Sequence, residues 1–336
     1  MQRPVRHLLT LLSGLLIAAQ ALAAQVGWTQ MDVFGSAPDA RVTPVALYFP
    51  TQAKASPVAM GPFTLNVAVG AAPEATVKGL IMLSHGTGGS ELGHSRLAEA
   101  LARAGYLVAA LRHPEDNWTD NSLLEKAPER YFQVRPRQVS HVLDALLQDP
   151  KWKDRIARDA RGPRVGALGH SAGGYTVLAL AGGEPDRAMI IRHCQEEGAL
   201  DPLFCAMGHP AQRPEPAPIP LKDARVRAVV AMAPVGVVFT AQSLARITVP
   251  TAIWEAQSDR WLVPRFHAEW IAQNMPRAEL HRVPNSWHFA FMDTPSTAIP
   301  TLDGDIRADP PGFDRAAFLT QLGGELVVFF DQAFKE

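Results

Sequence analysis

The fold is decided by the stretch Arg164-Val165-Gly166-Ala167-Leu168-Gly169-His170-Ser171-Ala172-Gly173-Gly174. The run up to Leu168 is typical of a buried strand, and a helical pattern follows from Ala172. Small residues stand two positions before and two positions after Ser171, which lets a strand and a helix approach closely at a sharp turn. The sequence therefore predicts that the Ser171 hydroxyl stands clear of the backbone at the start of a helix.

Short apolar runs alternate with amphipathic stretches on both sides of this turn. The runs indicate strands at 46–49, 64–69, 79–83, 106–111, 164–168, 227–232, 250–254 and 279–283. Helical patterns cover 95–104, 136–147, 172–181, 264–273 and 314–334. This alternation is typical of a mostly parallel sheet with helices on both faces, so the predicted class is α/β.

One stretch, residues 182–221, interrupts the alternation. It contains both cysteines of the chain and a proline-rich run at 210–218. Because proline removes backbone donors and fixes φ, we expect no regular helix or central strand here, but a lid or cap over the edge of the sheet. A plain interdomain linker is the alternative. Residues 25–336 are otherwise predicted to form one domain.

Residues 1–24 are typical of a secretory signal peptide. Arg3 and Arg6 precede an apolar stretch at 8–19, and Ala21-Leu22-Ala23 offers small residues for cleavage. An uncleaved anchor is the alternative, but the apolar stretch is shorter than the roughly 20 residues that a bilayer needs. We therefore expect a periplasmic or secreted protein without stable membrane insertion after cleavage.

The composition excludes several classes of function. The chain has 336 residues, of which 47% are hydrophobic, so it can bury a sizeable core and is not disordered. With 32 basic and 33 acidic residues, it lacks the basic excess of a nucleic-acid-binding protein. Its 11 histidines form neither an HExxH motif nor a close His/Asp cluster, so no metal site is expected. Nothing in the sequence indicates the oligomeric state.

Export also bears on Cys194 and Cys205, the only two cysteines. An oxidising compartment permits a disulfide between them, which would close a small loop in the excursion at 182–221. The alternative is a pair of reduced, buried thiols.

A nucleophilic serine needs a base, and the base needs a carboxylate that holds its tautomer. Downstream of Ser171, Asp259 follows the predicted strand at 250–254, and His288 follows the one at 279–283. These two residues are our candidates for acid and base. Glu255, at the end of the strand at 250–254, competes with Asp259 for the role of the acid.

The negative oxygen of a tetrahedral intermediate needs two hydrogen-bond donors. The glycine-rich stretch Ser84-His85-Gly86-Thr87-Gly88-Gly89 follows a predicted buried strand, so its backbone amides are free to point into a site. We assign one donor to the backbone N–H of Thr87 and the other to that of Ala172. A phosphate-binding loop is the rival interpretation, but no lysine occupies the P-loop position.

Several further residues are candidates for shaping the site. The aromatic side chains that could form a substrate-binding wall are Trp118, Trp261, Trp287, Phe289 and Phe291, and each could equally belong to the core. Asp116 and Asn117 follow the predicted strand at 106–111, where they either shape the site or close a turn.

The sequence resembles the α/β-hydrolase superfamily, and within it the dienelactone hydrolase-like branch that includes platelet-activating-factor acetylhydrolase-like esterases. The resemblance covers nearly all of the chain after residue 24. It rests on the stretches 84–89, 113–117, 169–175, 288–291 and 311–315, on both cysteines, and on Asp259 with Pro264. It implies an α/β-hydrolase fold and a triad in the order Ser171, Asp259, His288. Where many relatives have glycine, this chain has Glu255.

These observations predict an exported enzyme that cleaves short-acyl or aromatic carboxylic esters through an acyl-enzyme on Ser171. Such a reaction needs no cofactor because water completes the cycle. The expected partner is a small ester. The alternatives are an amide or lactone hydrolase that uses the same triad, and a hydrolase-fold protein that binds an apolar ligand without turnover.

Overall fold

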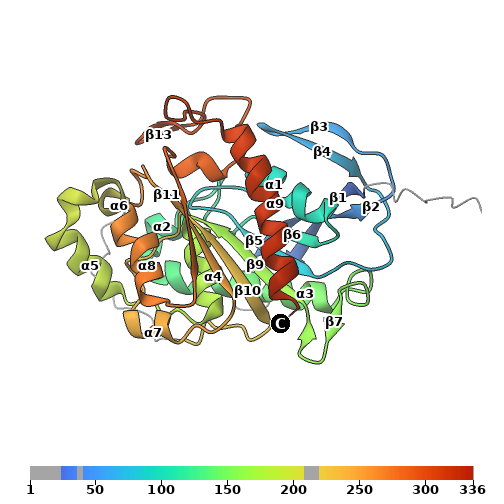
Figure 1. Cartoon of the computed structure of the whole chain (residues 1–336), viewed down its shortest axis with the longest axis horizontal. Coiled ribbons are helices and arrows are strands. Elements are labelled where there is room, and N and C mark those ends of the chain that lie inside the picture. The colour runs from blue at the N-terminus through green and yellow to red at the C-terminus, as the bar shows by residue number, and fades with distance from the viewer. Residues whose placement is uncertain (1–23, 36–40, 208–218, 336) are drawn as a thin grey trace, which may run out of the picture.

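The computed structural model describes residues 24–35, 41–207 and 219–335. Within these ranges, ten strands form one sheet in the order β12-β11-β10-β9-β5-β6-β2-β1-β4-β3 (Figure 1). The six strands from β12 to β6 run parallel, and β1 to β4 extend the sheet through mainly antiparallel pairs. The strands are β1 (Gln25–Phe34), β2 (Val42–Thr51), β3 (Ser56–Met60), β4 (Phe63–Val69), β5 (Leu80–Ser84), β6 (Leu107–Leu111), β9 (Val165–His170), β10 (Val226–Met232), β11 (Thr251–Ala256) and β12 (Glu279–Val283).

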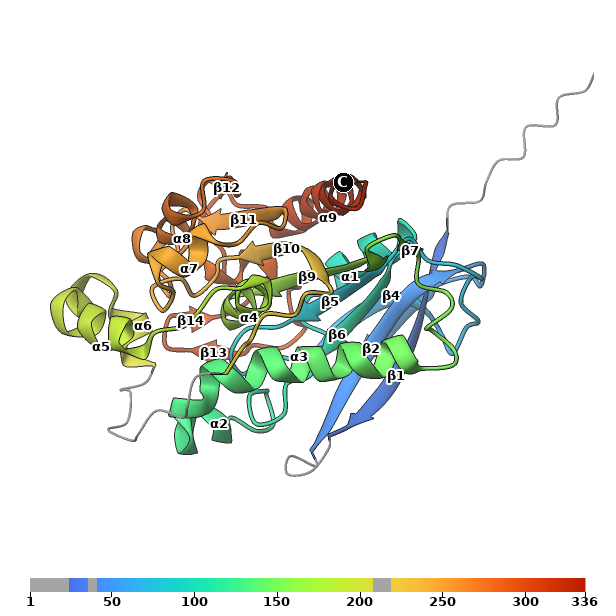
Figure 2. The ribbon, with the colours of Figure 1, turned by 90° about the horizontal axis from the view of Figure 1, so that it is seen from below.

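Helices cover both faces of this sheet (Figure 2). One face carries α1 (Ser95–Arg103) and α9 (Arg315–Ala333), and the other carries α3 (Tyr131–Gln148), α4 (Ala172–Ala181), α7 (Ala241–Ala245) and α8 (Ala268–Asn274). Shorter elements complete the described part: α2 (Ser122–Lys126), α5 (Arg187–Glu196), α6 (Pro202–Ala206), four 3-10 turns η1 (Pro128–Arg130), η2 (Gly198–Leu200), η3 (Pro264–Phe266) and η4 (His288–Phe291), and two short hairpins, β7 (Arg158–Asp159) with β8 (Gly162–Pro163) and β13 (Pro300–Thr301) with β14 (Gly304–Asp305).

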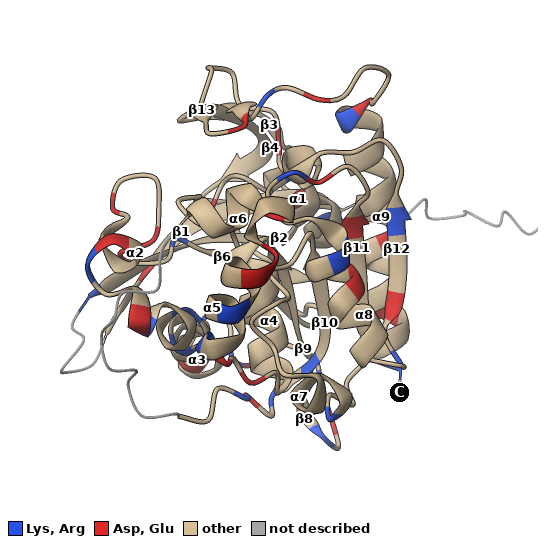
Figure 3. Ribbon diagram, turned by 90° about the vertical axis from the view of Figure 1, so that its left-hand side faces the viewer, with Lys and Arg blue, Asp and Glu red and all other residues tan. Residues whose placement is uncertain are grey.

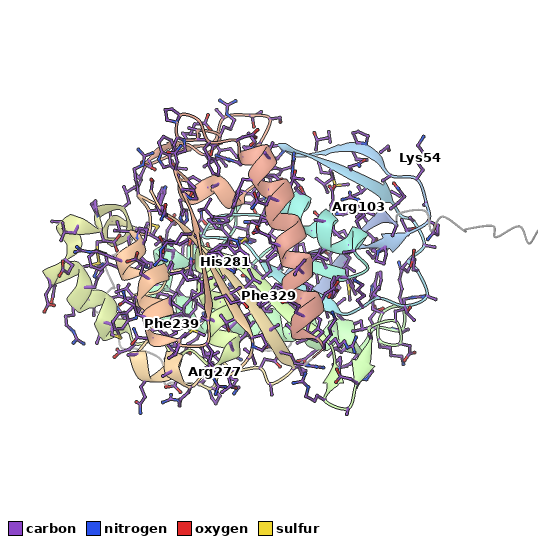
Figure 4. All side chains as sticks on the ribbon, viewed as in Figure 1. Lys54, Arg103, Phe239, Arg277, His281 and Phe329 are labelled. Atoms are coloured by element: carbon purple, nitrogen blue, oxygen red, sulfur yellow. A yellow bond between two sulfur atoms is a disulfide. The ribbon has the colours of Figure 1, made fainter. Side chains whose placement is uncertain are left out.

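The core lies in two layers, because successive side chains of a strand point to opposite faces. Leu47 packs in the layer beneath α3 and α4, and its neighbour Tyr48 packs in the layer beneath α1 and α9. Phe239 belongs to the first layer and Phe329 to the second; both are labelled in Figure 4.

The predicted α/β class and all eight predicted strands are confirmed, whereas two strands of the sheet were missed. β1 mixes glutamine, threonine and aspartate with apolar residues, and it is fixed by pairing with β2 along its whole length. β3 contains Pro57 and lies at the edge of the sheet, where a missing backbone donor is tolerated.

Two helix predictions need correction. The helix expected to begin at Pro136 begins five residues earlier, at Tyr131, so this proline lies in the second turn of α3 instead of at its start. The expectation that residues 182–221 contain no regular helix is wrong, because α5 and α6 lie between the end of α4 and the proline-rich run. α5 is capped by Asp186, and Pro202 takes the first position of α6, where a proline loses no hydrogen bond.

The predicted signal peptide falls on residues that, apart from Ala24, lie outside the described ranges, and the whole proline-rich run at 210–218 does so too. Among the described residues, no helix is long and apolar enough to cross a membrane. The same residues contain no group of three or more His, Cys, Asp or Glu side chains that could hold a metal ion. Figure 3 shows that basic and acidic residues are intermixed on the face that carries α5, α6 and α8.

Candidate active site

Ser171 lies between the end of β9 and the start of α4, as the sequence predicts. Its backbone has φ = 58° and ψ = −119°, a conformation that residues with a Cβ rarely adopt. The turn is held in place because the Ser171 N–H donates to the Met232 carbonyl at 2.9 Å, and the Ser171 carbonyl accepts from the N–H groups of Tyr175 and Val235. The side chain is therefore fixed at the carboxyl edge of the parallel strands.

The two glycines that flank Ser171 are required by close packing. A Cβ on Gly169 would overlap the backbone of Gly173, and a Cβ on Gly173 would overlap the backbone of Ser84 and His85. Any larger residue would therefore force the elbow away from β5 and from its own helix.

Asp259 and His288 are brought together from the loops after β11 and β12. His288 Nδ1–H donates to Asp259 Oδ2 at 2.7 Å, and both side chains are buried. The other carboxylate oxygen, Oδ1, accepts the backbone N–H groups of Trp261 and Leu262 at 2.8 and 2.9 Å. Asp259 is thus held in one orientation toward the imidazole.

Glu255, the competing candidate for the acid, lies elsewhere. Its side chain is buried within β11, and one carboxylate oxygen is 3.7 Å from Arg282 Nε. Burial raises the pKa of this carboxyl group above its ordinary value. The structure therefore pairs His288 with Asp259.

The position of His288 relative to the elbow is set by the residue before Ser171. His170 Nε2–H donates to the His288 carbonyl at 3.0 Å, and the two imidazole rings lie 4.8 Å apart. Within the described residues, Ser171 Oγ makes no hydrogen bond. In the absence of substrate, catalytic hydrogen bonds are often long or poorly aligned.

The glycine-rich loop after β5 lies against Ser171. A Cβ placed on Gly86 would be 3.1 Å from the Ser171 Cβ. Neither the Thr87 N–H nor the Ala172 N–H donates a hydrogen bond within the described residues, the latter because it begins helix α4. Both predicted oxyanion donors are therefore available at the rim of the same cavity.

This cavity has a volume of about 90 Å³ and a mainly apolar lining. Its walls come from the glycine-rich loop after β5, from the segment around α2 and α3, and from α5 and α6 of the excursion. They comprise Thr87, Leu124, Pro128, Tyr131, Phe132, Ala172, Arg187, Ile190, Phe204, Met207 and Val235. The excursion at 182–221 thus supplies one wall of the cavity beside Ser171.

The aromatic residues predicted for substrate binding are not among those that line this cavity. Trp118 is 66% exposed, and the Trp287 ring stacks on the Arg260 guanidinium at 4.0 Å. Trp261 and Phe289 lie beside the proposed base, with ring centroids 6.3 and 5.3 Å from the His288 imidazole. Phe291 is fully buried in the core.

Sequence reasoning missed the aromatic residues that do line the cavity, Tyr131, Phe132 and Phe204. The first two precede the expected start of their helix, and Phe204 lies in a stretch expected to lack helices. The sequence signal that could have found Tyr131 and Phe132 is a helical pattern that continues upstream of Pro136, through residues 131–135.

The excursion is tied down by two sets of contacts. A disulfide joins Cys194 of α5 to Cys205 of α6. Asp201 Oδ2, fully buried, accepts the Nε2–H groups of both His193 and His267 at 2.9 Å. These hydrogen bonds and burial act on the Asp201 carboxyl in opposite directions, and the net result is a pKa below its ordinary value. The charged carboxylate therefore links the excursion to the loop that leads into α8.

With this sheet, its covering helices and the sharp strand-to-helix turn at Ser171, the chain has the α/β-hydrolase fold. Two solved structures share it along nearly the whole length. A ferulic acid esterase from Streptomyces cinnamoneus is 20% identical, with a TM-score of 0.63, over 94% of this chain and 92% of that one. A dienelactone hydrolase from Anabaena variabilis is 15% identical, with a TM-score of 0.52, over 92% of this chain and 98% of that one. No protein-family model and no curated protein sequence matches the chain.

Proposed function

We propose that this protein is an exported serine hydrolase that cleaves carboxylic esters through an acyl-enzyme on Ser171. The observation that carries the proposal is the hydrogen bond of 2.7 Å between His288 and Asp259. The carbonyl of the same His288 accepts a hydrogen bond from His170, the residue before Ser171. An imidazole oriented by a carboxylate next to a strained serine elbow is the arrangement that activates a serine hydroxyl.

In the proposed cycle, His288 Nε2 accepts the proton of Ser171 Oγ–H as the oxygen attacks the ester carbonyl carbon. The backbone N–H groups of Thr87 and Ala172 stabilise the negative oxygen of the tetrahedral intermediate. As the intermediate collapses, His288 gives the proton to the leaving alcohol and Ser171 keeps the acyl group. His288 then takes a proton from water as the water oxygen attacks the acyl carbon, and it returns that proton to Ser171 Oγ as the carbon–Oγ bond breaks and the acid leaves. No cofactor enters the cycle.

The size and lining of the cavity favour a short or compact apolar substrate group. At about 90 Å³ the cavity matches a short acyl group, whereas a long chain would have to extend beyond it into solvent on its open side. Ile190, Phe204 and Phe132 offer apolar and aromatic surface to that group. We therefore propose short-acyl or small aromatic esters as substrates; one of the two similar structures is a ferulic acid esterase.

Export is part of the proposal on separate grounds. The N-terminal sequence predicts a signal peptide, and a disulfide between Cys194 and Cys205 is typical of an oxidising compartment. We place the mature protein in the periplasm or outside the cell.

A series of p-nitrophenyl esters from acetate to palmitate, hydrolysed by residues 25–336, tests this function. We expect turnover that falls as the acyl chain lengthens and that is lost in Ser171→Ala. Labelling by a fluorophosphonate probe is expected in the wild type and absent in Ser171→Ala. Turnover that survives in Ser171→Ala, or a wild-type protein that neither hydrolyses the esters nor takes the label, would contradict the proposal.

A further inference from the structure

A buried ion pair contacts the glycine-rich loop at 84–89, which carries the Thr87 N–H. Asp116 follows β6, Arg135 lies in α3, and both side chains are completely buried while their charged groups are in contact. Removing two charges from water costs free energy that their mutual attraction does not always offset. Such a pair is therefore weak evidence for stability, and its contacts indicate another role.

The pair forms hydrogen bonds with the two peptide groups on either side of the one that carries the Thr87 N–H. Asp116 Oδ1 accepts the Gly88 N–H at 2.9 Å, on the C-terminal side of Thr87. Arg135 Nη2 donates to the His85 carbonyl, on the N-terminal side. Both neighbouring peptide planes are thus fixed by buried, charged groups.

The peptide between them is oriented through its own carbonyl. The Gly86 carbonyl accepts from His85 Nδ1–H at 2.6 Å and from the Gly89 N–H at 3.2 Å. In a trans peptide the N–H points opposite to the C=O, so the Thr87 N–H points away from His85 and Gly89. Burial lowers the pKa of His85 to about 4, which keeps its imidazole neutral.

The same ion pair reaches the other parts of the oxyanion site. The Tyr131 hydroxyl donates to Asp116 Oδ2 at 2.8 Å, so Thr87 Oγ1, 2.7 Å from that hydroxyl, donates to Tyr131 in turn. Arg135 Nε donates to Thr176 Oγ1 in α4, the helix that begins with the second donor, Ala172.

We propose that Asp116 and Arg135 are positioning residues that hold the Thr87 N–H in the orientation required to bind the oxyanion. This inference rests on the proposed ester hydrolysis and adds residues that touch no substrate. An oxyanion donor lowers the barrier only if it is already aimed at the developing charge. Loosening the pair therefore weakens transition-state binding and leaves binding of the ground-state ester unchanged.

The test compares Asp116→Asn with Asp159→Asn in the full mature chain. Asp159 also pairs with a buried arginine, Arg227, at 2.8 and 2.9 Å, but it lies before β9, at the opposite end of that strand from Ser171. Both substitutions remove one charge next to a buried guanidinium and keep the shape of the side chain. Circular dichroism and gel filtration establish that each variant is folded.

For Asp116→Asn we expect kcat on p-nitrophenyl acetate to fall by about 10- to 100-fold with KM changed by less than about twofold. The affinity for a trifluoromethyl ketone, whose adduct with Ser171 places an oxyanion in the same position, is expected to fall by the same factor. Asp159→Asn is expected to retain wild-type kcat and ketone affinity. A purely structural role for Asp116 would not link the loss of kcat to the loss of ketone affinity.

If Asp116→Asn does not fold, Tyr131→Phe carries the test, because it keeps both charges and removes only the hydroxyl that donates to Asp116 and accepts from Thr87 Oγ1. We expect a fall in kcat and in ketone affinity of about 3- to 10-fold. The positioning role alone is overturned if a folded Asp116→Asn has the same kcat and ketone affinity as Asp159→Asn. If Asp116→Asn does not fold, the same result for Tyr131→Phe overturns it. A wild-type protein without Ser171-dependent turnover overturns both this role and the proposed function.

Discussion

The backbone of Ser171 allows a test of the elbow that does not depend on activity. At φ = 58° and ψ = −119°, a residue with a Cβ is strained and glycine is not. Ser171→Gly therefore relieves the strain, whereas Ser171→Ala keeps the Cβ. Both variants lack the hydroxyl, so the difference between them isolates the backbone conformation.

The size of the effect follows from two opposing contributions. Holding a non-glycine residue in such a conformation costs about 1–3 kcal/mol. Glycine also loses more conformational freedom on folding, which costs roughly 0.4–1 kcal/mol. Ser171→Gly is therefore expected to raise the free energy of unfolding by about 1 kcal/mol, or the Tm by about 1–2 °C in a chain of this length. Ser171→Ala is expected to stay within about 0.5 kcal/mol of the wild type, since the hydroxyl has no partner in the described structure.

Urea denaturation followed by circular dichroism measures all three free energies of unfolding at one pH. The reasoning is supported if Ser171→Gly is the most stable of the three proteins while it takes no fluorophosphonate label. If Ser171→Gly is no more stable than Ser171→Ala, the elbow is not strained in solution and the reasoning is refuted.

Three further predictions concern other parts of the chain. Burial raises the pKa of Glu99 from 4.5 to about 7, so the folded state holds this proton to higher pH than the unfolded state and loses stability as the pH rises through that window. In urea titrations, the stability advantage of Glu99→Gln over the wild type should therefore grow from about pH 4.5 to 7 and then level off. A difference that stays constant with pH would contradict the shift. In the double variant Cys194→Ser/Cys205→Ser, the free energy of unfolding should fall by up to about 3 kcal/mol, because the bridge closes a loop with a sequence separation of 11. Amide hydrogen exchange should rise first in α5 and α6, and unchanged exchange there would exclude a restraining role of the disulfide. Gly173→Ala should give little soluble protein in a fractionation assay, because its Cβ would overlap the Ser84 carbonyl oxygen; a soluble, active variant would show that the helix can shift away.

The parallel half of the fold was predictable because local pattern and tertiary position agree there. Buried parallel strands read as continuous apolar runs, and the run at 164–168 leads straight into an elbow that only small flanking residues permit. β1 was not predictable from its own residues, since its ten positions alternate irregularly and pairing with β2 determines its conformation. The start of α3 was misplaced because a proline is common at a first helical position and tolerated a turn later at some cost.

For the candidate site, the sequence predicted which residues at strand ends lie close together, while their catalytic roles stay a proposal. Asp259 and His288 were found in this way, and their hydrogen bond places them together. The cavity wall could not be predicted, because Ile190 and Phe204 come from the excursion and Phe132 from α3, segments far apart in the sequence that line one cavity only in the folded chain. For Asp116 the sequence left open whether it shapes the site or closes a turn, since its partner Arg135 lies 19 positions away in a helix.

Three unfavourable features of the described residues lie at one edge of the sheet. A positive φ at Ser171, an ion pair with no exposed surface at Asp116 and Arg135, and a neutral, buried His85 all lie where β5, β6 and β9 end. Each feature lowers stability by itself, and the two core layers on either side of the sheet offset the sum. Strain and buried charge collect at functional sites because the fixed geometry they provide is what the chemistry requires. The buried ion pair and the neutral His85, which are not part of the serine motif, therefore point to the same edge as that motif.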